Sequence, residues 1–114
     1  MRSAEQKRAE HAWNEANKNN NKKFMALAKG APALIMSNGL MPSLAFWQSK
    51  AEYRALVNAL LGWLNKKGLL TNDKFDDSIK TIQNSDSDQY MRITEETLEY
   101  LKWLRNFVGA VVKE

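Results

Sequence analysis

Residues 49–68 read SKAEYRALVNALLGWLNKKG and carry the clearest amphipathic pattern in the chain. Apolar side chains recur there at steps of three and four residues: Tyr53, Leu56, Val57, Leu60, Leu61 and Leu64. This period places them on one face of an α-helix. Ser49 and Glu52 have the form of a capping box at its start, and Gly68 marks its end. The segment therefore predicts one helix with a wide buried face.

Helical patterns also fill the rest of the chain. The other expected helices cover residues 4–18, 22–38 with an interruption, 42–49, 73–83 and 87–112. Ser3 and Gln6 form a capping box before the first helix. The run Asn19-Asn20-Asn21 ends that helix and offers an N-cap for the next. We expect an all-α fold because no segment alternates with period two.

The second helix contains two positions that disfavour it. Gly30 and Pro32 predict a kink or a break, because proline lacks the N–H that would bond to residue 28. Further on, Asn38-Gly39 fits either a β-hairpin turn or a helix C-cap. The C-cap is favoured, since no further strands exist to complete a sheet. Gly39 would then adopt a positive φ, with Leu40 folding back on the helix.

The last predicted helix carries two apolar stripes. The first stripe comprises Tyr90, Ile93, Thr97, Leu98, Leu101, Leu104, Val108 and Val111, and the second comprises Tyr100, Trp103 and Phe107. One stripe is enough to fill the core of a domain of this size. Because wide apolar surface is rarely left in water, the second stripe predicts contact with a partner.

Composition agrees with one folded domain. The 114 residues are 44% hydrophobic and 26% charged, close to the averages for globular domains. We expect a single compact bundle of five or six helices over residues 1–114. No apolar run approaches the roughly 20 residues of a membrane span, and the charged start lacks a signal region. The sequence thus predicts a cytoplasmic protein without membrane contact.

Residues that could support catalysis are scarce. The chain has no cysteine and one histidine, His11, which lies on a polar stretch and is expected to be exposed. Two acidic groups are typical of solvated surface: Asp73, Asp76 and Asp77, and Glu95, Glu96 and Glu99. Neither a phosphate-binding glycine loop nor a metal-binding spacing is present. We predict that the chain is not an enzyme and needs no cofactor or metal.

Basic residues are the more informative group. Residues 1–70 hold eleven Lys and Arg against four Asp and Glu, a balance of +7, whereas residues 71–114 hold six against nine, a balance of −3. Long cations on one face bind phosphate, although lysines also simply keep a surface soluble. On local charge, the candidate RNA-binding residues are Lys22, Lys23, Arg54, Lys66 and Lys67. No base-reading motif accompanies them, so contact with backbone and shape is expected.

Several short motifs follow one another in a specific order. They are Arg8-Ala9-x-x-Ala12-Trp13, Asn38-Gly39-Leu40, Leu44-Ala45-Phe46 with Lys50, and then Tyr90, Thr94, Glu96, Leu98 and Tyr100-Leu101-x-Trp103-Leu104-Arg105. In this order, over nearly the whole chain, they resemble the small all-helical subunit of Cmr-type (type III-B) CRISPR effector complexes. The resemblance adds Arg8, Lys50 and Arg105 to the candidate RNA-binding residues. Trp13 and Phe46 are expected to be core rather than base-stacking residues.

The resemblance implies a non-catalytic role in RNA-guided antiviral defence. Family members stack head to tail as a filament beside larger backbone subunits, touch the guide RNA–target RNA duplex and dock on the large signalling subunit. The basic body and acidic tail suit this role, because head-to-tail stacking needs two different complementary surfaces. The alternative is a helical protein–protein adaptor or regulator that binds no nucleic acid.

Overall fold

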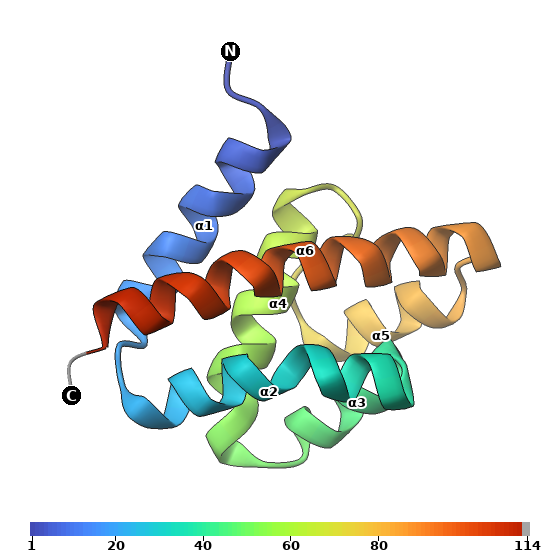
Figure 1. The fold of residues 1–114 in the computed structure, drawn as a ribbon. Coiled ribbons are helices and arrows are strands. Elements are labelled where there is room, and N and C mark those ends of the chain that lie inside the picture. The colour runs from blue at the N-terminus through green and yellow to red at the C-terminus, as the bar shows by residue number, and fades with distance from the viewer. Residues whose placement is uncertain (113–114) are drawn as a thin grey trace.

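Six α-helices and one short 3₁₀-helix make up the computed structural model, which describes residues 1–112. The elements are α1 (Ala4–Lys18), α2 (Lys22–Asn38), α3 (Leu40–Gln48), η1 (Ala51–Tyr53), α4 (Arg54–Lys66), α5 (Phe75–Gln83) and α6 (Ser87–Val111). No β-strand occurs within those 112 residues. The predicted all-α bundle is confirmed (Figure 1).

Helix α4 lies at the centre of the bundle. It buries Leu56, Val57, Ala59, Leu60, Leu61, Trp63 and Leu64. Four other α-helices pack on it (α1, α2, α3 and α6). Helix α6 crosses in front of α4 in Figure 1, with α2 running beside it in the opposite direction. The amphipathic segment recognised in the sequence is therefore the core helix of the fold. In the part of the chain that the structure describes, no helix has the length and apolarity to cross a bilayer.

Helix α2 continues through Gly30 and Pro32, so of the predicted kink or break the break does not occur. Proline removes one helical hydrogen bond. On either side of it, however, α2 presents Ala28, Ala31 and Ile35 to the core, all essentially without solvent exposure. Burial of this face on both sides of Pro32 outweighs the missing bond and keeps the helix in one piece.

Gly39 forms the joint between α2 and α3. Its φ is 90°, as the C-cap prediction requires, and its N–H donates to the Ile35 carbonyl at 2.8 Å. The same residue is the N-cap of α3, so α3 begins at Leu40 rather than at the predicted Pro42. In addition, the Tyr90 hydroxyl of α6 accepts a hydrogen bond from the Met41 N–H at 3.2 Å, which satisfies a free donor in the first turn of α3.

The predicted capping box of Ser49 and Glu52 is absent. Ser49 ends α3, and its hydroxyl donates to the Phe46 carbonyl at 2.7 Å. Glu52 lies within η1 and pairs with Lys23 instead, at 2.9 Å. The 3₁₀ turn inserted before α4 separates the pattern from the helix that it was expected to start.

The second stripe of α6 is covered by the chain itself. Tyr100 is fully buried, and Trp103 and Phe107 are partly buried against the core. Trp13 of α1, 45% exposed, packs edge-on against Phe107 with ring centroids 5.3 Å apart. The stripe thus packs on α1 of the same chain instead of needing a separate partner as predicted, which is consistent with α1 and α6 forming the most extensive helix pair.

Two glycines give opposite predictions for stability. Gly39→Ala should lower the free energy of unfolding by about 1–3 kcal/mol, because φ near 90° with ψ near 165° strains any residue that has a Cβ. Gly30→Ala is the matched control. A Cβ there meets no atom within 4 Å, so α2 should gain about 1 kcal/mol of helix propensity. Urea unfolding of both variants measures the difference, and equal stabilities would contradict the cap geometry.

Candidate nucleic-acid interface

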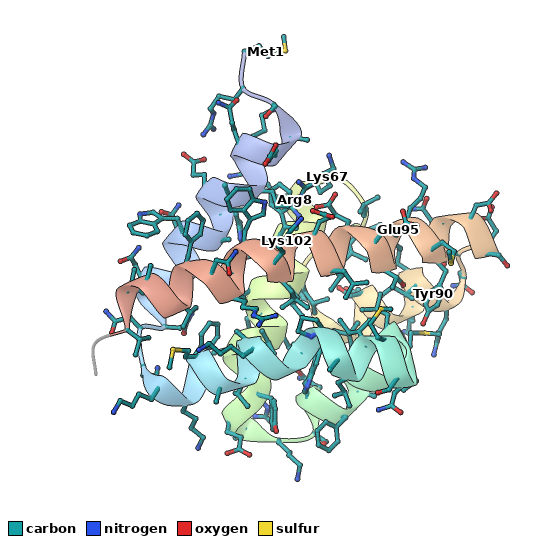
Figure 2. The ribbon with its side chains drawn as sticks, in the orientation of Figure 1. Met1, Arg8, Lys67, Tyr90, Glu95 and Lys102 are labelled. Carbon is teal, nitrogen blue, oxygen red and sulfur yellow. The ribbon has the colours of Figure 1, made fainter. Side chains whose placement is uncertain are left out.

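The structure does not gather the eight candidate RNA-binding residues on one face. Lys66 and Lys67 lie at the C-terminal end of α4. The residues Lys22, Lys23, Lys50 and Arg54 lie around its other end, on α2, at the end of α3 and at the start of α4. The 13-residue helix separates these two groups by roughly 20 Å. Arg105 lies on α6, away from both groups. Arg8 lies on α1 and contacts α6 through Glu96 (Figure 2).

The cations near the start of α4 are held by the chain's own atoms. Lys23 pairs with Glu52 at 2.9 Å. The Arg54 Nε donates to the Gln48 carbonyl at 3.4 Å, and the Lys50 Nζ lies 5.6 Å from the centroid of the Phe46 ring. These contacts are exposed and individually weak. Among residues 1–112, Lys22 is the one cation of this group whose amine makes no ion pair, hydrogen bond or cation–π contact.

Arg8 forms a partly buried ion pair instead of facing solvent. Its Nε and Nη2 donate to the two carboxylate oxygens of Glu96 at 2.6 and 3.0 Å. The side chains are 13% and 11% exposed. The Trp63 Nε1 donates to the same carboxylate at 2.9 Å. This Arg8–Glu96–Trp63 clamp joins α1, α6 and α4, so the expectation that Glu96 is solvated is wrong. For Arg8, RNA contact stays a prediction, and the neutralised charge argues against it.

The electrostatics of the clamp favour the charged carboxylate. Burial alone would raise the pKa of Glu96, but the hydrogen bonds from Arg8 and Trp63 outweigh it and hold the pKa below its ordinary 4.5. The same hydrogen bond, donated by Arg8 to Glu96, raises the pKa of Arg8, so the guanidinium stays charged. Both partners are therefore fully ionised near neutral pH, in the geometry of a bidentate pair.

His11 lies in an aromatic cage, contrary to the expectation of an exposed histidine. Its ring is 5.6 Å from that of Trp63 and 5.3 Å from that of Tyr100, and its Nδ1 is 2.7 Å from the Tyr100 hydroxyl. Burial, and then the charges of Lys66 and Lys18, lower the pKa of His11. Burial likewise raises the pKa of the Tyr100 hydroxyl. The neutral imidazole can thus accept a hydrogen bond from the Tyr100 hydroxyl, and burial together with the nearby lysine charges favours that neutral form.

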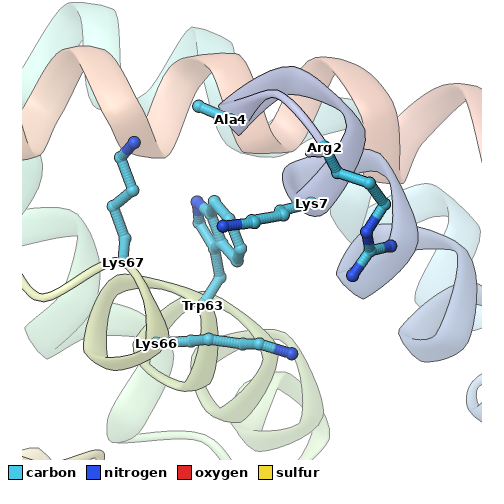
Figure 3. A pocket seen from close by; sticks show the side chains of 6 residues that line it. All are labelled: Arg2, Ala4, Lys7, Trp63, Lys66 and Lys67. Carbon is cyan, nitrogen blue, oxygen red and sulfur yellow. The ribbon is translucent and has the colours of Figure 1, made fainter.

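A pocket of about 380 Å³ opens between the start of α1 and the end of α4. It is lined by Arg2, Ala4, Lys7, Trp63, Lys66 and Lys67, and we call it the basic pocket. Figure 3 shows Lys7 extending from α1 toward the Trp63 indole, with Lys66 and Lys67 at the end of α4. Sequence reasoning found Lys66 and Lys67 but missed Arg2 and Lys7. No local signal marks these two, since only the crossing of α1 and α4 brings them to the other lysines.

Arg105 lines a different cavity, a groove of about 330 Å³ between α2 and α6. Its other lining residues are Pro32, Met36, Leu98, Lys102 and Asn106. Lys102 lies 3.7 Å from Glu99, and Met36 is 74% exposed. This groove is largely apolar with a cationic edge, whereas the basic pocket concentrates positive charge. Of the two, the basic pocket has the chemistry that phosphate requires.

Two comparisons with known proteins complete the description. Residues 4–111 match the family model described as CRISPR-associated protein (Cas_Cmr5). The fold is similar to the crystal structure of a CRISPR-associated Cmr5 family protein from Thermus thermophilus, with a TM-score of 0.81 and 24% sequence identity. That similarity covers 98% of this chain and 100% of the other.

The clamp predicts a pH-dependent stability. Glu96→Gln should lower the free energy of unfolding by about 2 kcal/mol at neutral pH, because Arg8 is left without its charged partner. Since the folded-state pKa of Glu96 is depressed, this contribution is present above about pH 4.5 and is lost as the pH falls through the folded-state pKa. Urea unfolding across that range measures it. Glu95→Gln, an exposed neighbour, is the control and should change little; equal effects of the two substitutions would contradict the clamp.

Proposed function

The chain belongs to the Cmr5 family of CRISPR-associated proteins and is a small subunit of a type III-B CRISPR complex, and from this we propose that it is a non-catalytic scaffold for RNA-guided defence in the cytoplasm. Several copies stack into a short filament that supports the pairing of guide RNA with target RNA. The observation that carries the proposal is the family match over residues 4–111, nearly the full chain.

The distribution of charge supports contact with an RNA backbone. The chain has 17 Lys and Arg against 13 Asp and Glu, and its clearest cationic cavity, the basic pocket, has no exposed aromatic face for a base. A subunit with such a surface contacts phosphates and duplex shape. In RNA-guided systems sequence is read by base pairing between guide and target, so a scaffold needs no base-reading element.

Contacts with protein partners need a second kind of surface. We propose that neighbouring copies and the larger Cmr subunits use the acidic start of α5 and the exposed apolar side chains of α2 and α3. At the start of α5, Asp73 and Asp76 are exposed. On α2 and α3, Met36 and Phe46 are 74% and 45% exposed. Different surfaces of this kind suit head-to-tail stacking, which pairs two unlike patches.

Affinity purification from the native host tests the proposed function. The tagged chain should recover the larger subunits of a CRISPR complex together with guide RNAs of uniform length. Nuclease treatment before purification is the control, because it distinguishes subunits bound by protein contacts from those bridged by loose RNA. Recovery of unrelated proteins without RNA would favour the adaptor role instead.

Charge reversal at the start of α5 tests the stacking surface. Asp73→Lys with Asp76→Lys should lower the number of copies per purified complex, because a complementary basic surface would be repelled. Asp77 is left unchanged, since it accepts a hydrogen bond from the Asn72 side chain at 2.9 Å. The copy number is measured by native mass spectrometry, and circular dichroism checks the helix content.

Lys74→Glu with Lys80→Glu provides the control for this experiment. It also changes charge on α5 and its N-cap, at two exposed positions, but in the acidic direction. The copy number should then stay normal. A normal copy number in the aspartate variant as well would remove α5 from the stacking interface.

A further inference from the structure

The cations of the basic pocket come from two elements that are far apart in sequence. Arg2 and Lys7 belong to the start of the chain and α1, whereas Lys66 and Lys67 stand at the end of α4 and just after it. All four residues line one cavity of about 380 Å³ (Figure 3). The packing of α1 against α4 thus builds a concentration of positive charge that neither helix has alone.

Most of this charge is not paired in a salt bridge within residues 1–112. Arg2 pairs with Glu10 at 3.0 Å. In the described part of the chain, no carboxylate oxygen lies within 4.0 Å of the amine of Lys7, Lys66 or Lys67. The other carboxylate close to the pocket, Glu96, is already bound by the clamp. Like charges that share a cavity repel one another, and the longer-range attractions of Lys66 to Glu10 and of Lys67 to Glu96 act against this repulsion.

The floor of the pocket is rigid and offers no base-stacking face. Trp63 is 2% exposed. Its indole N–H is bound to Glu96, and its ring stacks on Tyr100 with centroids 5.9 Å apart and an interplanar angle of 8°. A nucleobase cannot displace these contacts. The accessible groups of the pocket are therefore amines and the aliphatic stems of lysines.

We propose that the basic pocket binds the sugar–phosphate backbone of RNA through Lys7, Lys66 and Lys67. The proposal rests on the proposed function for the presence of RNA. The lysine amines are separate point charges that suit successive phosphodiester groups along a strand. Arg2 carries the one guanidinium group of the pocket, and this group pairs with Glu10. The pocket therefore has no unpaired guanidinium to bind a terminal phosphate through two parallel hydrogen bonds.

The structure includes a reporter for this pocket. His11 is the one histidine of the chain, and its proton signals are therefore unambiguous in NMR spectra. Its ring packs against Trp63, which forms the floor of the pocket. Burial, and then the charges of Lys66 and Lys18, lower the pKa of His11. Phosphate bound at Lys66 would offset that charge, so RNA binding should raise the pKa of His11. The other groups that face the ring are Tyr100 and, through Tyr100, Glu15.

Binding of the full chain to a short single-stranded RNA of arbitrary sequence tests the proposal, measured over a series of salt concentrations. Each lost phosphate contact lowers the slope of log K against log salt by about 0.7 for a single strand. Lys66→Gln with Lys67→Gln should therefore lower the slope by about 1.4, and Lys7→Gln by about 0.7. The matched control, Lys74→Gln with Lys80→Gln, removes two exposed lysines at the N-cap and on α5 and should leave the slope unchanged.

Each other outcome overturns the proposal in a distinguishable way. If Lys22→Gln with Lys23→Gln lowers the slope and the pocket variants do not, RNA binds near the start of α4 and the proposed function stands. If inorganic phosphate binds as tightly as RNA and causes the same rise in the pKa of His11, the pocket takes small anions. If the wild-type chain binds no RNA, the pocket is not an RNA site, while co-purification with CRISPR subunits still decides the proposed function separately.

Discussion

The hydrogen bonds that converge on Glu96 determine how the three helices around the basic pocket meet. The indole N–H of Trp63 is buried on α4 and needs an acceptor, which α6 supplies as a carboxylate. A buried carboxylate needs a cation, and α1 supplies Arg8 in bidentate geometry. Within residues 1–112, every buried side-chain nitrogen and oxygen has a hydrogen-bond partner. The apolar faces alone would let α1 slide along α6, whereas this clamp fixes one position.

The clamp also explains why consecutive basic residues of α1 differ in role. One residue along an α-helix turns the side chain by about 100°, so Lys7 and Arg8 point in different directions. Arg8 turns to the α6 carboxylate and is neutralised there, while Lys7 faces the cavity beside Lys66 and Lys67. The ion pair stabilises the helix crossing, and the crossing in turn holds three free amines together. Within one turn of α1, Arg8 thus serves the fold and Lys7 is available for the proposed RNA contact.

Helix caps and apolar spacing, read from the sequence, predict most of the fold but little of the basic pocket. The bounds of α1 and the positive φ of Gly39 follow from caps and apolar spacing, which act within a few residues. The break that the sequence allowed near Gly30 and Pro32 does not occur, because burial on both sides of Pro32 is a tertiary effect. The exposure predicted for His11 is wrong for the same reason, since Trp63 and Tyr100 of its cage come from α4 and α6. The basic pocket joins residues about sixty positions apart, and no periodicity encodes a helix crossing.

The burial of Trp63 finally limits what the basic pocket can recognise. An exposed indole among lysines would stack on bases and give preferences among them. Here the indole is used by the core, so the surface presents charge without a base-reading group. Contacts of this kind hold any RNA sequence equally well, and they leave discrimination to the pairing of guide with target. The same residue that fixes the helix crossing therefore keeps the proposed RNA contact independent of sequence, as a scaffold that serves many different guides requires.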